Sequence, residues 1–174
     1  QKSKVLPGVT EEQQEAVSLL ARRAGGKISV SWDKESGTPT FFTGDIPSEK
    51  VVSKSPGALQ LAACRFLGEN KTIFRLNTPG EELLLLQQQE DDLGMSHLKF
   101  NQVYKGIPVW ASQLIVHFNK DGAIQSINGR YHPSFEISTA PSISREIAIS
   151  LAQSQVKDQA ENAEAELYIY PKDG

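Results

Sequence analysis

The chain has 174 residues, of which 39% are hydrophobic, enough to build one domain or two small ones around apolar cores. Its formal net charge of −3 lacks the basic excess that nucleic acid or an anionic membrane attracts, so we expect neither as a partner. The longest purely apolar run is Leu83 to Leu86, too short to span a membrane. Because the chain opens at Gln1 rather than at methionine, we expect a processed or trimmed segment.

The first 26 residues predict a separate helical segment, and a hairpin follows it. Thr10 and Gln13 have the spacing of a capping box, and apolar residues then recur at helical intervals as far as Gly25. Apolar and polar residues alternate from Ile28 to Trp32, and a second apolar run at 40–42 follows a turn signal. We therefore expect a short helix and then two antiparallel strands.

A longer amphipathic helix is predicted from Ser55 and Pro56 to Gly68, with Gly68 as its left-handed C-cap. Its apolar stripe should lie across a sheet, which would bury Leu59, Ala63, Phe66 and Leu67. Two strands are predicted next, at 73–76 and 82–90. Since the run from Leu83 to Leu86 is continuous, we expect the second strand to be covered on both faces.

Three further strands are predicted between residues 97 and 133, where apolar and polar residues alternate in three runs. The first reversal is at 105–108, where Gly106 accepts positive φ and Pro108 keeps Ile107 out of the helical region. The second, at 119–122, has the pattern of a three-residue loop with a bulge. The predicted register sets Phe118 opposite Ile124, His117 opposite Gln125 and Ile115 opposite Ile127.

The composition changes after Pro133. Residues 134–141 read as a linker, and a helix is predicted to begin near Ser142 with a stripe formed by Ile147, Ala148, Leu151 and Ala152. Residues 166–170 alternate like a strand, and Asp173-Gly174 is typical of a hairpin turn whose returning strand is missing. We therefore expect an unpaired strand edge around Leu167 or Ile169.

The patterns of catalytic sites are absent from the sequence. It has no His-Glu-x-x-His zinc motif, no Gly-x-Ser-x-Gly nucleophile elbow and no phosphate-binding glycine loop. The three histidines, His97, His117 and His132, are scattered over strands; His97 and His117 can approach each other on adjacent strands, but a third ligand and a base are not evident. We predict no catalytic residue and no metal site in this chain.

The stretch from His97 to Gly129 closely resembles the fungalysin/thermolysin propeptide (FTP) motif of secreted zinc metalloproteases. The resemblance rests on the residues His97-Leu98-Lys99-Phe100, Gln102 to Val109, Leu114-Ile115-Val116-His117, Asp121-Gly122 and Ile127-Asn128-Gly129. Within it, we assign a structural role to Gly106, Pro108, Asp121, Gly122, Asn128 and Gly129.

This resemblance implies an α+β fold in which a curved antiparallel sheet packs on a helix, as in cystatin, over residues 27–133. It also implies, after the linker, the first part of a PepSY domain at 142–174, which would be an incomplete second small α+β domain. The thermolysin-like prosegments that the chain resembles are non-catalytic, so zinc and calcium are expected only in the attached catalytic domain.

The function that the resemblance implies is that of a secreted prosegment, an intramolecular folding chaperone and inhibitor whose partner is the cognate metalloprotease catalytic domain. The residues expected to contact this partner are Tyr104, Lys105, Ile107 and Trp110, because large aromatics and a cation at a tight loop are typical interface anchors. An alternative is that Tyr104 and Trp110 only cover the core of the sheet. A second alternative is that the chain is a free-standing secreted binding or inhibitor module with the same fold.

Overall fold

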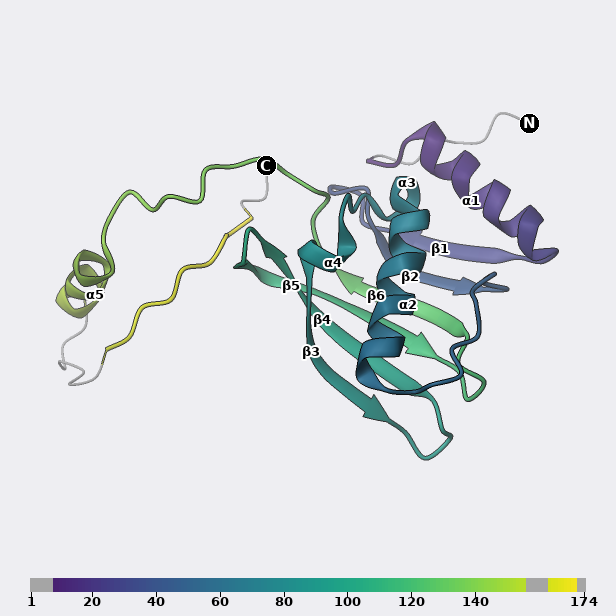
Figure 1. Ribbon diagram of the computed structural model, residues 1–174. Helices are drawn as coiled ribbons and strands as arrows, with labels where there is room; N and C mark the ends of the chain where they lie inside the picture. The colour runs from purple at the N-terminus through teal and green to yellow at the C-terminus, as the bar shows by residue number, and fades with distance from the viewer. Residues whose placement is uncertain (1–7, 156–162, 172–174) are drawn as a thin grey trace.

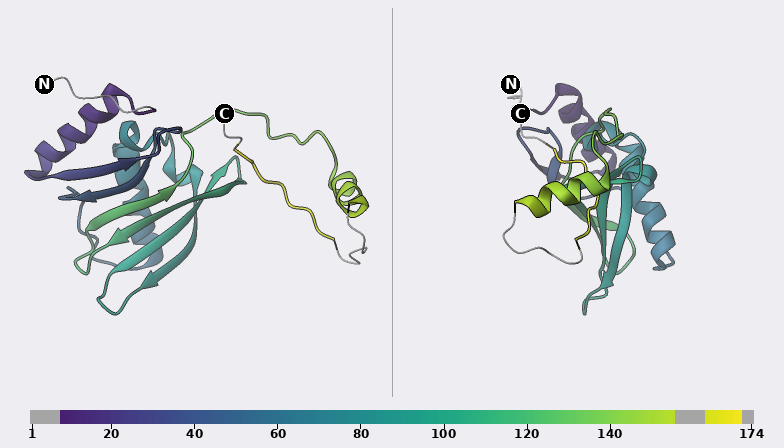
Figure 2. Two further views of the ribbon diagram at one scale, coloured as in Figure 1. Left: turned by 180° about the vertical axis from the view of Figure 1, so that it is seen from behind. Right: turned by 90° about the vertical axis from the view of Figure 1, so that its left-hand side faces the viewer.

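The computed structural model describes residues 8–155 and 163–171. Six antiparallel strands form one sheet in the order β1-β2-β6-β5-β4-β3, and helix α2 (Pro56–Glu69) crosses one of its faces (Figure 1). The opposite face carries no helix within the described residues, as the view from behind shows (Figure 2). The α+β architecture predicted from the sequence, with a helix packed on an antiparallel sheet, is confirmed.

Helix α1 (Glu11–Ala24) begins at the predicted capping box, in which the Thr10 hydroxyl accepts from the Gln13 N–H and the Gln13 side chain accepts from the Thr10 N–H. The buried Gln13 amide also donates to the carbonyls of Gly37, at 2.8 Å, and Ile73, at 3.1 Å. Gln13 therefore ties α1 to the turn between β1 (Ile28–Trp32) and β2 (Pro39–Gly44), which form the predicted hairpin.

The apolar stripe of α2 supplies one half of the core, as predicted. Leu59, Ala63 and Leu67 are fully buried and Phe66 is 5% exposed. The Phe66 ring lies 6.2 Å from that of Phe42 on β2 and 6.1 Å from that of Phe74, measured between centroids. The sheet supplies the other half of the core through inward side chains of β4, β5 and β6, which include Leu98, Phe100, Leu114, Val116 and Ile127.

The end of α2 differs from the prediction. Gly68 lies inside the helix rather than capping it, because Asn70 ends the helix by donating both its backbone N–H and its side-chain amide to the Phe66 carbonyl. The strand predicted at 73–76 is also wrong, since residues 71–74 form the one-turn helix α3 (Lys71–Phe74). A short apolar run carries too little periodicity to separate a helix from a strand, and here both conformations would bury Ile73 and Phe74.

Strand β3 (Leu83–Glu90) follows the short helix α4 (Pro79–Glu82) and forms one edge of the sheet. Leu83 is buried, whereas Leu84 is 56% and Leu86 49% exposed, so the prediction of a strand covered on both faces is wrong. The reason is its position: α2 covers one face of the sheet, and the other face of this outermost strand is open to solvent.

The three predicted strands of the meander are β4 (Ser96–Tyr104), β5 (Ile107–Phe118) and β6 (Ile124–Arg130). Phe118 pairs with Ile124 as predicted, and the Asn119 N–H donates to the Ala123 carbonyl at 2.8 Å to close the loop. Beyond this pair the predicted register is wrong by one residue, because a bulge at 117/118 sets His117 opposite Ser126 and Ile115 opposite Asn128.

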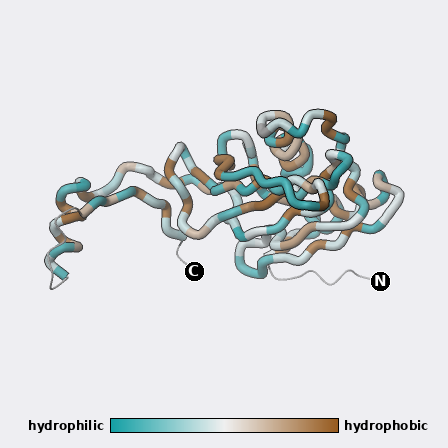
Figure 3. Tube along the Cα trace, turned by 90° about the horizontal axis from the view of Figure 1, so that it is seen from below, coloured by the Kyte–Doolittle hydropathy of each residue, from teal (hydrophilic) through white to brown (hydrophobic). Residues whose placement is uncertain are grey.

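Helix α5 (Arg145–Ser154) is capped by Ser144, two residues later than predicted, and lies apart from the sheet (Figure 3). Its Ile147 and Leu151 are 51% and 55% exposed. The strand predicted at 166–170 is reduced to one parallel bridge between Ile169 and Val109. Asp173 and Gly174 lie outside the described residues, and no helix in the described ranges is long and apolar enough to cross a membrane.

Candidate partner-binding site

The first reversal of the meander is a two-residue turn between Tyr104 and Ile107, which pair across β4 and β5. Lys105 has φ of 50° and Gly106 has φ of 80°. Two successive residues with positive φ are characteristic of the type I′ turn, whose twist matches that of paired strands. Glycine adopts this conformation without strain, whereas Lys105 is held in it by the strand pairing on either side.

The side chains around this turn are only partly covered. The Tyr104 ring packs on Phe135 of the linker, with ring centroids 4.9 Å apart, and the Lys105 ammonium lies 5.0 Å from the centroid of the Tyr104 ring. Lys105 itself is exposed, while Tyr104 and Ile107 are half-buried. The turn therefore exposes the Lys105 ammonium next to the partly exposed side chains of Tyr104 and Ile107.

Trp110 comes from an irregular part of β5. Val109 is buried, but Trp110 and Ala111 are both exposed, and Ala111 has φ of 54°. This breaks the alternation of the strand and leaves the Trp110 side chain 53% exposed. Its indole packs edge-on against Tyr168 at 5.4 Å, and its backbone N–H donates to the Ile169 carbonyl at 2.8 Å. The C-terminal segment (residues 163–171) is thus docked on β5 beside the turn, through Tyr168 and Ile169.

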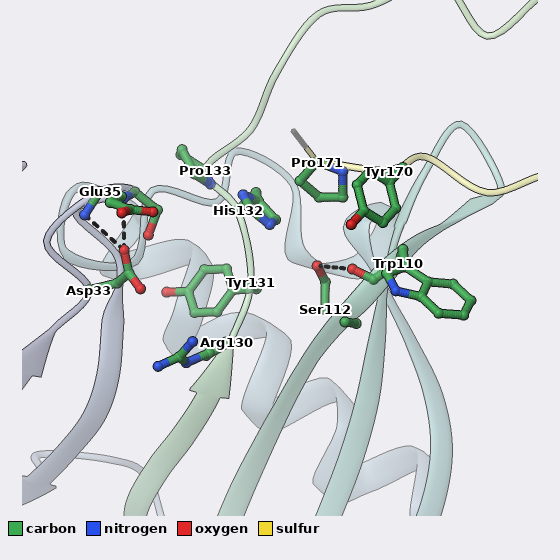
Figure 4. Close-up of a pocket in the computed structure, with 12 residues that line it drawn as sticks. Asp33, Glu35, Trp110, Ser112, Arg130, Tyr131, His132, Pro133, Tyr170 and Pro171 are labelled. Carbon is green, nitrogen blue, oxygen red and sulfur yellow. Dashed lines mark hydrogen bonds between the residues drawn. The ribbon is translucent and has the colours of Figure 1, made fainter. Parts of the chain in front are cut away.

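An open cavity of about 520 Å³ lies next to Trp110, between the β1–β2 turn, the end of β6 and the C-terminal segment (Figure 4). Asp33 lines one side, where its carboxylate accepts from the backbone N–H groups of Ser36 and Glu35, each at 2.9 Å. These bonds, mainly that from Ser36, lower the pKa of Asp33, and the charge of Arg130 lowers it further. No sequence pattern predicts this cavity, since its walls come from four segments that no motif connects.

The six motif residues lie at turns and close approaches. A side chain on Gly122 would overlap the carbonyl oxygen of Val51, and one on Gly129 would overlap that of Gln113. Asp121 is in the exposed β5–β6 loop, where its N–H donates to the Asn119 side chain. The remaining three take part in the turn or in contacts between strands: Gly106, Pro108 and Asn128.

The three histidines do not form a metal site. His97 and His117 meet across β4 and β5, with 2.7 Å between their Nδ1 atoms, whereas the backbone of His132 bonds to the Gln102 side chain elsewhere in the fold. Within residues 8–155 and 163–171, no group of three or more His, Cys, Asp or Glu side chains is placed to hold a metal ion.

Comparison with known proteins relates this chain to a known protein family. Residues 81–131 match the family model of the Fungalysin/Thermolysin Propeptide Motif, a range that runs from the end of α4 through β3 to β6 and the residue after them. The chain is 31% identical over 138 residues to a thermolysin of Alicyclobacillus acidocaldarius, a match that covers 79% of the chain and 23% of the relative. It is 35% identical over 102 residues to bacillolysin of Bacillus amyloliquefaciens (58% and 19%) and 27% identical over 175 residues to the thermostable neutral protease NprT of Geobacillus stearothermophilus (91% and 31%).

The fold and these matches define a class of protein: an α+β prosegment domain built around the fungalysin/thermolysin propeptide motif. More narrowly, the chain is a propeptide of the thermolysin-like proteases. It spans between about a fifth and a third of the length of the curated relatives that it matches.

Proposed function

We propose that this chain is the non-catalytic prosegment of a secreted thermolysin-like zinc metalloprotease, and that it assists the folding of the catalytic domain and inhibits it. The observation that carries the proposal is the propeptide motif at 81–131, which occupies the four strands β3 to β6 of the sheet. The partner would be the cognate catalytic domain, and zinc and calcium would belong to that domain.

The physical reason for a chaperone is the slow search for contacts between distant residues in a large protease domain. A prefolded surface lowers this barrier if it binds the folding chain, and the sheet offers such a surface because α2 covers only one of its faces (Figure 2). Inhibition follows if the same complex persists with the folded enzyme and places part of the prosegment over its cleft.

The residues proposed to bind the partner are Tyr104, Lys105, Ile107 and Trp110. Trp110 is the strongest candidate, because a half-exposed indole on a strained strand has no role in the buried core. Exposed aromatic side chains beside a cation are the usual anchors of protein interfaces. We propose that the turn between β4 and β5 is the anchor of the prosegment on the protease.

We also propose the domain division 1–26, 27–133, 134–141 and 142–174, with the last part related to PepSY domains. The division after residue 133 is supported by α5, which has no buried residue, whereas Leu20 of α1 belongs to the same core cluster as the sheet and α2, which extends to Tyr131.

The binding role of Trp110 can be tested by titrating the mature cognate protease with the chain and with the variant Trp110→Ala. We expect the variant to bind at least about thirtyfold more weakly, the usual loss at an interface hot spot of about 2 kcal/mol. Val52→Ala is a matched surface control, because Val52 is 99% exposed in a loop away from the turn, and it should bind as the parent chain does.

Tyr168→Ala separates a direct contact from an indirect one. This variant removes the ring that packs on Trp110 and leaves the indole in place. If Tyr168→Ala weakened binding as much as Trp110→Ala, the docked C-terminal segment rather than the indole would carry the interaction. If no variant or parent chain bound the protease, the free-standing module would be the better account.

A further inference from the structure

The two histidines of the motif form a direct pair on the open face of the sheet. His97 on β4 and His117 on β5 are register partners, and their neighbours Leu98 and Val116 point to the core on the other face. The two Nδ1 atoms lie 2.7 Å apart, and the ring planes meet at 69°. This distance is that of a strong hydrogen bond, so a proton must lie between the two nitrogens.

The outer nitrogen of each ring is also engaged. His97 Nε2 lies 3.1 Å from a carboxylate oxygen of Asp91, in the turn between β3 and β4. His117 Nε2 bonds to the side-chain oxygen of Asn128 on β6. A continuous row of four side chains therefore joins that turn to three strands of the sheet.

The number of protons in this row follows from its geometry. The side-chain oxygen of Asn128, rather than its amide nitrogen, faces His117 Nε2, and a carboxylate oxygen of Asp91 faces His97 Nε2. Because both oxygens only accept hydrogen bonds, each Nε2 carries a hydrogen in this arrangement. A neutral imidazole with its hydrogen on Nε2 has a lone pair on Nδ1, and two such lone pairs would face each other. The pair therefore holds one extra proton, shared between the two Nδ1 atoms, and carries one positive charge. A second extra proton would bring two N–H donors face to face and separate the rings.

The surroundings favour this single charge. The Asp91 carboxylate also accepts from the backbone N–H groups of Met95 and Leu93, each at 2.9 Å. The bond from Met95 and, to a smaller extent, the contact with His97 lower the pKa of Asp91, so it is charged when histidines titrate. The residues opposite the pair are neutral, Gln89 on β3 and Ser126 on β6, and the charged side chains further along this face are Lys99 on β4 and Arg130 on β6.

We propose that His97 and His117 form a proton-sharing pair that acts as an acid-sensitive latch on the prosegment. In the unfolded chain each histidine takes up its proton independently at about pH 6.5. Well below that pH the unfolded chain holds two extra protons and the folded pair one, so the fold loses stability as pH falls. Well above it the folded pair holds one and the unfolded chain none, so the fold loses stability as pH rises. The contribution of the pair is therefore largest near about pH 6.5 and falls on both sides, approaching tenfold in the unfolding equilibrium constant per pH unit.

The histidine pair links β4 and β5, two of the strands that carry the propeptide motif. Separation of the two rings in acid should therefore destabilise the surface that binds the protease. This consequence rests on the proposed function, whereas the proton count does not. Acidification would then favour release of the catalytic domain.

The first test is chemical denaturation of the whole chain between about pH 4.5 and 8.5, a range that spans the titration of histidine. The double variant His97→Gln/His117→Gln is compared with the parent chain, and His132→Gln is the control, since His132 lies outside the pair. We expect the stability difference between parent and double variant to peak near about pH 6.5 and the control to follow the parent. A flat or steadily rising difference would overturn the proposal.

The second test needs no variant. Nitrogen-15 NMR of the imidazole rings in the folded parent chain should show hydrogens on both Nε2 atoms and one proton shared by the two Nδ1 atoms. The second extra proton should be taken up only as the chain unfolds. Two independent titrations in the folded protein would refute the pair.

The third measurement concerns release from the cognate protease. The parent complex should dissociate faster below about pH 6 than the double-variant complex, because histidine charges in this range. Equal release of both would overturn the functional consequence. Absence of any complex would contradict the proposed function and leave the first two tests unaffected.

Discussion

Replacing Phe66 by Ala tests the packing of α2 on the sheet most sharply. The Phe66 side chain is 5% exposed and completes a cluster of three rings with Phe42 and Phe74. Truncation of a buried phenylalanine to alanine costs about 3 to 5 kcal/mol through lost burial and the cavity that remains. Each of its two ring contacts adds about 0.5 to 1.5 kcal/mol, so we expect a loss in the upper half of that range.

The assay is urea denaturation followed by circular dichroism, with the free energy of unfolding extrapolated to water. Leu61→Ala is the matched control, because Leu61 lies on the same helix and is 63% exposed. It should change the stability by less than about 0.5 kcal/mol, as is usual at surface sites. A loss below about 1 kcal/mol for Phe66→Ala, well under the usual core range, would show that α2 does not pack on the sheet in this way.

Two further predictions follow from the motif and from the absence of a catalytic pattern. Gly129→Ala should destabilise the fold by about 1 to 3 kcal/mol in the same assay. The added methyl group would overlap the Gln113 carbonyl, and Gly129 has φ of 153°, which strains any other residue. Unchanged stability would contradict the close approach of β5 and β6. The purified chain should hydrolyse no peptide substrate; a chelator-sensitive activity that persisted after removal of contaminating proteases would refute the non-catalytic assignment.

The elements predicted well from the sequence are those whose signals are local. The capping box at Thr10, the stripe of α2 and the loop at Gly122 each place the deciding residues within one helix or one hairpin. The position of a strand within the sheet is not predicted by such local signals, because it depends on the order of the strands. Nothing near Leu84 and Leu86 in the sequence indicates that β3 is an edge strand, so the local pattern does not predict that these two side chains are exposed.

The same difference between local signals and long-range contacts applies to the candidate site. The turn at Lys105 and Gly106 was predicted because Gly and Pro mark it locally, and the approach of His97 and His117 followed from adjacent strands. The docking of residues 166–171 on Trp110 and the cavity beside Asp33 were missed, because they bring together segments far apart in the chain. The one-residue error of register came from the bulge at 117/118, which changes pairing without any glycine or proline to mark it.

The most direct measurement of the central claim is the refolding of the denatured cognate catalytic domain with and without the chain. The account predicts that one equivalent of the folded chain raises both the rate and the yield of recovered peptidase activity, once the chain has been diluted away from the active enzyme. An inert protein of similar size should give neither increase. Recovery that is the same with the chain as with the inert protein would contradict the assignment of this prosegment as a folding chaperone.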